Sequence, residues 1–108
     1  PSSMKAAILN FSRMKARFRI LVLGDMMELG EFSNQEHRDL VELCRTLDLD
    51  RVILIGEQFC KAATGGNEIC LQDLAEAIKY LDREPVKDAR ILLKASRKMQ
   101  LEQLIPLL

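Results

Sequence analysis

Two short segments carry most of the side chains in this sequence that could do chemistry. In the first, Leu21-Val-Leu-Gly-Asp-Met-Met-Glu-Leu-Gly-Glu-Phe32, a run of strand-forming residues ends at Gly24 and is followed by two carboxylates, Asp25 and Glu28. A carboxylate at the end of a strand can bind a ribose hydroxyl, a metal-bound water or a substrate amine. Such side chains also commonly accept hydrogen bonds from the amides of their own loop, and both roles stay open for Asp25 and Glu28.

His37 is the only histidine in the sequence. It shares a helical spacing with Leu40 and Cys44, so we expect its ring to point partly toward the interior. Two roles are open: a partly buried ring bonded to a loop carboxylate, or a contact to a phosphate or another substrate group. One histidine among scattered carboxylates does not match zinc ligation, so no metal site is predicted.

The second segment, Lys94-Ala-Ser-Arg-Lys98, places three cations and a hydroxyl where a predicted strand ends and a predicted helix begins. Ser96 can cap that helix. A carboxylate or phosphate would meet the helix N-terminus and the forked guanidinium of Arg97 there. Capping does not explain Lys94, so we favour an anion-binding role for Lys94 and Arg97 over a purely solvated surface.

The elements that position these residues follow from the hydrophobic periodicity. Short runs that are apolar throughout predict strands buried on both faces, and the helix-length segments between them predict a mainly parallel sheet in a three-layer α/β fold. In such folds, ligands bind beyond the carboxyl ends of the strands. The predicted strands cover residues 19–24, 52–55, 68–70 and 90–94. Helices are predicted after Ser2 or Ser3 and after Ser33 or Asn34 as possible N-caps, over residues 58–64, and from Leu71 on. The apolar face of the first helix is predicted at Met4, Ala7, Ile8 and Phe11, and that of the last helix at Leu101, Leu104, Ile105 and Leu108.

Composition limits the possible partners. The 108 residues fit one domain, 1–108, and Lys plus Arg balance Asp plus Glu at 16 each. A net charge of zero gives no general electrostatic reason to bind nucleic acid or an anionic membrane, so neither is predicted as a partner. The charge is uneven, however, because residues 1–20 hold five basic groups and no acid. These are either solvated surfaces, or the basic ends of the chain converge on an anionic ligand.

Several common sites are missing from the sequence. The three cysteines form no C-x-x-C pair, which favours reduced thiols and a cytoplasmic protein. There is no apolar run long enough to span a bilayer and no signal-peptide pattern. The sequence also has no phosphate-binding P-loop, no G-x-G-x-x-G fingerprint and no plausible catalytic triad. We therefore expect this chain alone to catalyse nothing.

Four segments stand in a familiar order: Pro1-Ser-Ser-Met-Lys-Ala-Ala7, Val22-Leu-Gly-Asp-Met-Met-Glu-Leu-Gly-Glu31, His37, and Leu93-Lys-Ala-Ser-Arg-Lys-Met-Gln-Leu-Glu102. In combination they resemble the C-terminal domain of the Mur ligase family. That domain is Rossmann-like, so the resemblance implies the same α/β fold for this chain. In the family, Pro1 would close an Asn-Ala-Asn-Pro element that joins the central domain to this one, so the chain is expected to be an excised third domain.

The resemblance also implies an activity for the full-length enzyme. It would use ATP and magnesium to phosphorylate the carboxylate of a UDP-N-acetylmuramoyl-tripeptide, and the amine of D-alanyl-D-alanine would attack the acyl phosphate to form an amide. The phosphate loop and the magnesium ligands would belong to a central domain outside this sequence. The partners of this chain would then be the two substrates and the central and N-terminal domains, and the fragment would hold no cofactor.

By the same resemblance, Ser96 and Arg97 would hold a substrate carboxylate or a phosphate, and Lys94 would add positive charge. Asp25, Glu28 and His37 would belong to a loop that faces the cleft between domains. Ala95 departs from the family pattern, which usually has glycine at this position. The alternative function is a stand-alone receiver-like or anion-binding regulatory module, with Asp25 and Lys94 at two strand ends.

Overall fold

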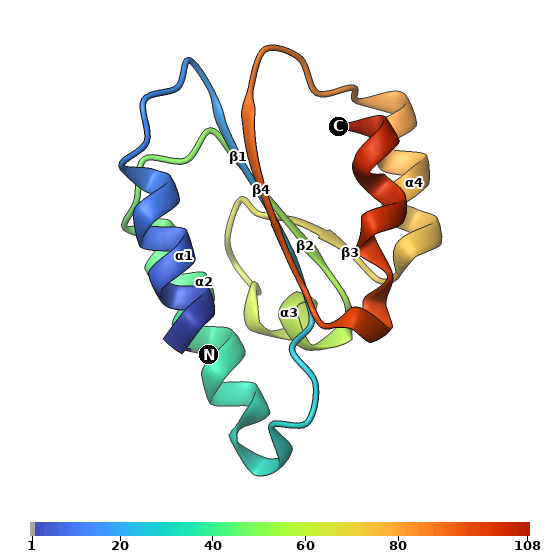
Figure 1. Cartoon of the computed structure of the whole chain (residues 1–108). Coiled ribbons are helices and arrows are strands. Elements are labelled where there is room, and N and C mark those ends of the chain that lie inside the picture. Colours follow the sequence, from blue (N-terminus) through green and yellow to red (C-terminus); the bar gives the residue numbers. More distant parts are fainter. Residues whose placement is uncertain (1) are drawn as a thin grey trace.

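The computed structural model describes residues 2–108 and, from Ser3 on, their side chains, so the predicted junction at Pro1 lies outside the described residues. Its centre is a four-stranded, all-parallel sheet with the strand order β3-β2-β1-β4. The predicted α/β class with a parallel sheet is confirmed (Figure 1). The strands are β1 (Arg19–Gly24), β2 (Arg51–Ile55), β3 (Ile69–Leu71) and β4 (Arg90–Lys94).

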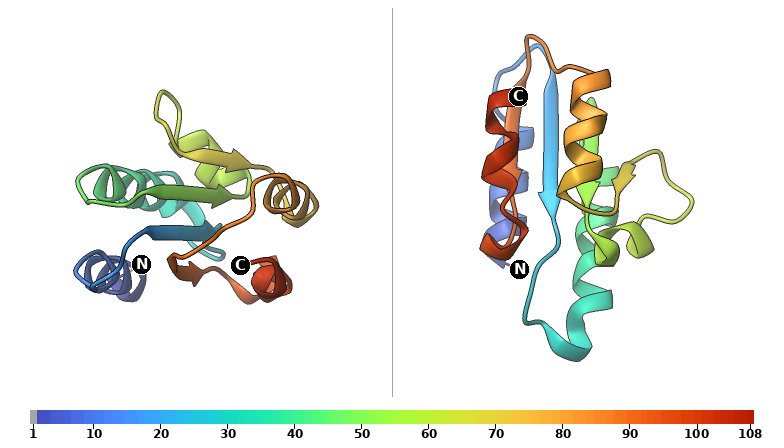
Figure 2. Two further views of the ribbon diagram at one scale, coloured as in Figure 1. Left: turned by 90° about the horizontal axis from the view of Figure 1, so that it is seen from above. Right: turned by 90° about the vertical axis from the view of Figure 1, so that its right-hand side faces the viewer.

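Helices cover both faces of the sheet, which makes the three layers visible from above in Figure 2. One face is covered by α1 (Ser2–Ser12), α2 (Ser33–Arg45) and α3 (Glu57–Ala62). The predicted apolar face of α1 packs inward: Met4, Ile8 and Phe11 are buried against the sheet. From α2 and α3, the same core takes Leu40, Val41, Cys44 and Phe59.

The other face is covered by α4 (Leu74–Arg83) and by the 3-10 helix η3 (Leu101–Leu107). The predicted apolar face of the last helix included Ile105, which is wrong, because that side chain is 59% exposed. The reason is the helix type: a 3-10 helix has three residues per turn, so Leu101, Leu104 and Leu107 face inward and Ile105 faces solvent.

Three predicted helix starts also differ from those in the structure. Ser33 and Asn34 lie inside α2 instead of capping it, since the chain already turns through the short 3-10 helix η1 (Gly30–Phe32). Leu71 belongs to β3, and α4 begins after Asp73, whose carboxylate accepts the Glu76 N–H at 2.9 Å. Ser2 and Ser3 likewise lie within α1.

The strand order contains one reversal, and it lies between β1 and β4. The chain leaves β1 toward α2 on one face of the sheet and leaves β4 toward η3 on the other face. The carboxyl ends of these two neighbouring strands therefore diverge and open a crevice, which is the usual ligand position in open α/β sheets. In Figure 1 this carboxyl edge of the sheet lies at the bottom.

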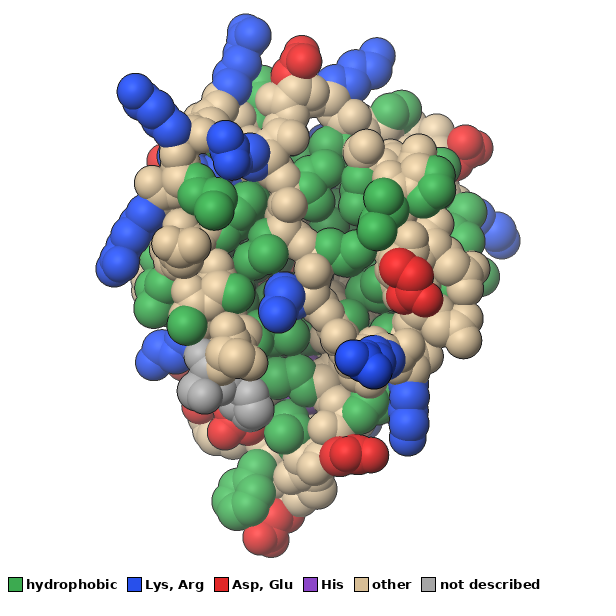
Figure 3. Space-filling model, in the orientation of Figure 1, with side chains coloured by type: hydrophobic (Ala, Val, Ile, Leu, Met, Phe, Trp, Pro, Cys, Tyr) green, Lys and Arg blue, Asp and Glu red, His purple; other side chains and the backbone are tan. Residues whose placement is uncertain are grey.

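The opposite, amino edge of the sheet is formed by the loops that precede β1 and β4. Figure 3 shows lysine and arginine side chains gathered along this upper edge of the molecule.

Within residues 2–108, none of the helices has the length and apolar content needed to cross a bilayer.

Candidate functional site

A pocket of about 510 Å³ opens at the carboxyl edge, where β1 and β4 end. It joins the two segments singled out in the sequence, since residues from both line it. A hydrogen bond from the Ser96 N–H to the Asp25 carbonyl oxygen, at 3.4 Å, links the two loops directly. The predicted convergence of these segments is therefore observed. The side chains lining the pocket include Ser3, Met27, Glu28, Lys94, Ser96 and Arg97.

Three cations line this pocket, Lys94, Arg97 and Lys98, and the first two are those predicted to bind an anion. Lys94 is the last residue of β4 and is paired in register with Leu23, so its side chain starts at the carboxyl edge. Arg97 is exposed and begins the short 3-10 helix η2 (Arg97–Met99). Within the described side chains, neither cation forms a salt bridge. Both are thus free to bind an anion in the pocket.

Ser96 caps η2, as predicted, because its hydroxyl oxygen accepts the Lys98 N–H at 3.2 Å. The cap uses the oxygen as an acceptor and leaves the hydroxyl proton free to donate. Ser96 can therefore hold the short helix in place and donate to a bound carboxylate or phosphate at the same time.

Glu28 is the one predicted carboxylate whose side chain lines the pocket. It is exposed, and its backbone has a positive φ of 63°, which is uncommon for a residue other than glycine. The carboxylate faces the same space as Lys94 and Arg97, so the pocket has an acidic and a basic side. An amine and a carboxylate on one ligand would match that pairing.

Asp25 belongs to the loop that borders the pocket, but its carboxylate does not face the pocket. It is 5% exposed, and its two oxygens accept the Gln58 and Phe59 N–H groups, each at 2.9 Å. These are free amides in the first turn of α3, so Asp25 acts as an N-cap supplied by a different strand. Of the roles left open in the sequence, accepting hydrogen bonds from amides is the observed one, but these amides belong to α3 and not to the loop that contains Asp25.

Gly56, the residue before α3, makes this cap possible. Its φ of 124° suits glycine, and a Cβ at this position would overlap with the Asp25 carboxylate. Gly24 has a similar steric role, because a Cβ there would lie 2.6 Å from the Ala95 methyl. The alanine that departs from the family pattern thus packs directly on a glycine.

His37 also lies behind the pocket and not in it. Its ring is fully buried; Nδ1 donates to the Ser33 carbonyl at 2.7 Å, and Nε2 accepts the Met26 N–H at 3.1 Å. This pair of bonds requires the neutral ring with its proton on Nδ1. The nearest Asp25 oxygen is 3.9 Å from Nε2, too far for a hydrogen bond. His37 therefore holds the loop after β1 by its backbone, and the predicted hydrogen bond to a loop carboxylate is not made. Its full burial leaves the ring no surface that faces the pocket.

The sequence analysis missed two contributors to this edge. Ser3 and Met4 of α1 line the pocket, although the sequence pattern predicts no site residue on the N-terminal helix. The amides of Gln58 and Phe59 were also overlooked as the partners of Asp25. The sequence does contain a signal for these amides, because a predicted strand is followed by Gly56 and then by a predicted helix. A helix that starts directly after such a turn has free N–H groups in its first turn.

The remaining reactive groups do not form a second site of nucleophilic or metal chemistry. Burial raises the pKa of the Cys44 and Cys60 thiols to about 12, so neither is a thiolate at neutral pH. All three cysteines are free. Among the described residues, no three His, Cys, Asp or Glu side chains come together as metal ligands.

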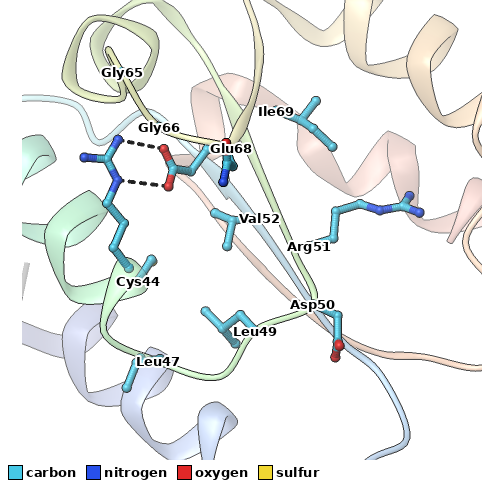
Figure 4. A pocket seen from close by; sticks show the side chains of 12 residues that line it. Cys44, Leu47, Leu49, Asp50, Arg51, Val52, Gly65, Gly66, Glu68 and Ile69 are labelled. Atoms are coloured by element: carbon cyan, nitrogen blue, oxygen red, sulfur yellow. Dashed lines mark hydrogen bonds and ion pairs between the residues drawn. The ribbon is translucent and has the colours of Figure 1, made fainter.

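A second pocket, of about 590 Å³, lies near the amino ends of β2 and β3 (Figure 4). Its main polar feature is a two-pronged ion pair, in which Arg45 donates to both carboxylate oxygens of Glu68, at 2.9 and 3.0 Å. Arg45 also donates to the Ala63 carbonyl at 3.2 Å. These bonds tie the loop before β3 to the end of α2, so the arrangement is structural.

This ion pair predicts a pH-dependent contribution to stability. Hydrogen bonds from Arg45 hold the pKa of Glu68 below its ordinary value of 4.5. The stabilisation is therefore present above pH 4.5 and is lost as the pH falls through the lowered pKa. We expect Glu68→Gln to lower the Tm at neutral pH and to approach the wild-type Tm in acid, as measured by circular dichroism. Glu57→Gln is the matched control, because the Glu57–Lys61 pair is exposed on both sides; an equal effect of both variants would contradict the prediction.

Fold and site together define a class: an α/β domain that presents a mixed-charge pocket at the point where its parallel strand order reverses. A family profile described as "Mur ligase, glutamate ligase domain" matches residues 1–97. The chain belongs to the Mur ligase family and forms the C-terminal domain of that family.

Relatives and solved structures agree with this assignment. The chain is 32% identical to UDP-N-acetylmuramoyl-tripeptide--D-alanyl-D-alanine ligase of Treponema pallidum, over 100% of this chain and 25% of the relative. It is 34% identical to the Bacillus subtilis protein of the same name, over 97% of this chain and 25% of the relative. The chain thus spans about a quarter of the length of these relatives.

Two crystal structures show the same fold. MurF from Acinetobacter baumannii superposes with a TM-score of 0.81 at 32% identity, covering 98% of this chain and 25% of that one. MurF ligase from Thermotoga maritima, solved in complex with ADP, superposes with a TM-score of 0.75 at 26% identity, covering 99% of this chain and 25% of that one. The Rossmann-like fold expected from the resemblance is confirmed.

Proposed function

We propose that residues 1–108 form one domain of a larger ATP-dependent ligase, which joins D-alanyl-D-alanine to a UDP-N-acetylmuramoyl-tripeptide in peptidoglycan synthesis. In this proposal the domain binds the incoming dipeptide and closes the cleft over the nucleotide. The observation that carries it is the pocket in which Lys94, Ser96 and Arg97 face Glu28. The names of the relatives that match the whole chain support the choice of ligase.

The pocket suits a small zwitterion. The carboxylate of D-alanyl-D-alanine would be bound by the guanidinium fork of Arg97 and the hydroxyl proton of Ser96, with Lys94 adding charge. Glu28 would attract the amine end of the same ligand. The amine must lose a proton and attack an acyl phosphate, with phosphate leaving, and the pocket would orient it for that attack.

ATP would supply the phosphoryl group that activates the tripeptide carboxylate. Lys94 and Arg97 fit a polyphosphate at the rim of a closed cleft, so this domain can assist nucleotide binding. The pocket does not fit a magnesium site, because Glu28 is the one carboxylate among its described lining residues, and both oxygens of the nearby Asp25 accept hydrogen bonds from amides. We propose that magnesium and most of the nucleotide are held by other domains, in a cytoplasmic enzyme.

The test compares the 108-residue chain with the full-length protein that contains it. We expect phosphate release by the full-length protein to require ATP, the UDP-linked tripeptide and D-alanyl-D-alanine together. We expect the chain alone to be inactive and to bind ATP only weakly by calorimetry, because the closed cleft supplies most of the binding energy. Turnover by the chain alone, or nanomolar ATP binding to it, would contradict the proposal that other domains are needed for catalysis and hold most of the nucleotide.

The alternative of a receiver-like module is disfavoured by one observation. A phosphoacceptor aspartate must be exposed, whereas Asp25 is buried with both oxygens hydrogen-bonded. Stable phosphorylation of Asp25 by acetyl phosphate, detected by mass spectrometry, would restore that alternative.

A further inference from the structure

The basic residues near the two ends of the chain divide into two groups in the fold. Lys94 and Arg97 lie at the carboxyl edge, in the proposed ligand pocket. Apart from Lys98, which also lines that pocket, and Lys5 on α1, the others gather at the amino edge, on or next to the loops that precede β1 and β4. Figure 3 shows lysine and arginine side chains projecting from this upper edge. We call this surface the amino-edge patch. It consists of Arg13, Met14, Lys15, Arg17, Phe18, Lys87 and Arg90, all exposed.

Direct contacts join the two loops into one surface. The Arg90 N–H donates to the Phe18 carbonyl at 2.9 Å, and the Arg90 guanidinium contacts the Met14 sulfur at 4.0 Å. The Arg17 guanidinium lies 5.8 Å from the centre of the Phe18 ring. Beneath them, Arg19 donates twice to the Met14 carbonyl, at 2.9 and 2.6 Å. These contacts hold the two loops together and place the cations around two apolar side chains, Met14 and Phe18.

Acidic residues near the patch only partly offset its charge. Asp50 is engaged, because its carboxylate accepts the Arg19 N–H at 2.7 Å. Glu84 and Asp88 are exposed on the second loop. The first loop, residues 13–18, contains three cations and no acid.

The two apolar side chains of the patch are unusually open to solvent. Phe18 is 43% exposed and Met14 is 38% exposed, although both lie next to the end of a well-packed sheet. A pocket of about 460 Å³ adjoins Phe18 and is lined by Pro85 and Val86 together with Lys87. An apolar centre surrounded by cations is the composition of surfaces that bind anionic bilayers.

We propose that the amino-edge patch docks on a bilayer containing anionic lipids. The cations lie against lipid phosphates, and Phe18 and Met14 enter the boundary between headgroups and acyl chains. A single-stranded nucleic acid is the weaker fit, because its binding sites combine a basic groove with several stacking aromatics. The patch has one aromatic ring, with Arg17 over it. The adjoining pocket adds Ile20, Pro85 and Val86 together with the charged Asp50, Arg51 and Lys87, but no second ring on which a base could stack.

This docking would leave the proposed ligand pocket free. The patch and the pocket lie at opposite ends of the same parallel strands, so the pocket faces away from the bilayer. The net charge of zero, which argued against a membrane partner in the sequence, is an average over the whole surface. Electrostatic attraction falls off within about 10 Å at ordinary salt, so local charges decide it, and the five cations of the patch lie on or beside two loops that contact each other directly.

The test is co-sedimentation of the 108-residue chain with phosphatidylcholine vesicles, with and without phosphatidylglycerol. We expect binding only to the anionic vesicles at about 0.1 M salt, and loss of binding at about 1 M salt, where the screening length falls to about 3 Å. Each removed cation should lower the partition coefficient about fivefold, so Arg13→Ala/Lys15→Ala should lower it about 25-fold. Phe18→Ser should weaken binding while leaving its salt dependence intact.

The matched control is Lys61→Ala/Lys79→Ala, which removes the same charge from exposed positions outside the patch. We expect this variant to bind like the wild type, and circular dichroism would verify the fold of every variant. Equal losses in the two double variants, equal binding to neutral vesicles, or no vesicle binding at all would overturn the proposal. Binding of single-stranded RNA without binding of anionic vesicles would assign the patch to nucleic acid and also overturn it.

Discussion

Replacing Arg97 with alanine is expected to lower kcat/KM for D-alanyl-D-alanine by about 10- to 100-fold in the full-length enzyme, most of it as a higher KM. The physical reason is the loss of a charge-assisted contact to the dipeptide carboxylate, worth about 1.5 to 3 kcal/mol. Arg97 is exposed and has no carboxylate partner among the described side chains, so its removal should not unfold the domain. Steady-state kinetics with varied dipeptide would measure the effect.

Two further variants make this result specific. Arg97→Lys keeps the charge but loses the two-pronged geometry, so we expect an intermediate loss. Arg83→Ala removes an exposed cation at the end of α4, away from the pocket lining, and should leave the kinetics unchanged. If Arg97→Ala and Arg83→Ala behaved alike, Arg97 would have no part in the site.

Replacing Asp25 with alanine is expected to cost the isolated chain about 3 kcal/mol of unfolding free energy. The variant leaves the Gln58 and Phe59 N–H groups without their buried, charged acceptor. That cost is a large share of the total stability of about 5 to 15 kcal/mol expected for such a domain. Urea denaturation followed by circular dichroism would measure it.

Asp73→Ala is the matched control for this prediction. Asp73 also caps a helix, but it is exposed and accepts a single N–H, from Glu76. We expect it to cost about 1 kcal/mol. The loss of unfolding free energy in Asp25→Asn should lie between those of Asp25→Ala and Asp73→Ala. One amide oxygen remains as an acceptor, but the NH₂ group of the asparagine faces an N–H donor. A cost of Asp25→Ala no larger than that of Asp73→Ala would show that the buried cap is not important for stability.

Much of the fold could be predicted because it depends on local pattern. Residues 19–24 and 90–94 read as buried strands since they are apolar almost throughout, and both are strands in the parallel sheet. The spacing of Met4, Ile8 and Phe11 determined the inward face of α1. Ser96 could be recognised as a cap because its acceptor role involves an N–H only two residues away.

The predictions that failed depended on partners distant in the sequence or on the exact type of helix. Asp25 bonds to amides 33 and 34 residues later in the chain, which no local pattern specifies. The same is true of the full burial of His37, which packs edge-on against Phe59 with ring centres 4.6 Å apart. Ile105 was misplaced because a 3-10 turn changes which residues face the core.

The sequence by itself thus determined the elements, the family and the convergence of the two chemical segments at the carboxyl ends of parallel strands. Only the tertiary structure decided which of the polar side chains remain free. In the fold, Asp25 and His37 form buried hydrogen bonds. Glu28, Lys94 and Arg97 line a pocket, and further basic residues lie at the opposite edge of the sheet. The physical reason is that a buried polar group must find a hydrogen-bond partner, and the packing of distant segments determines where that partner lies.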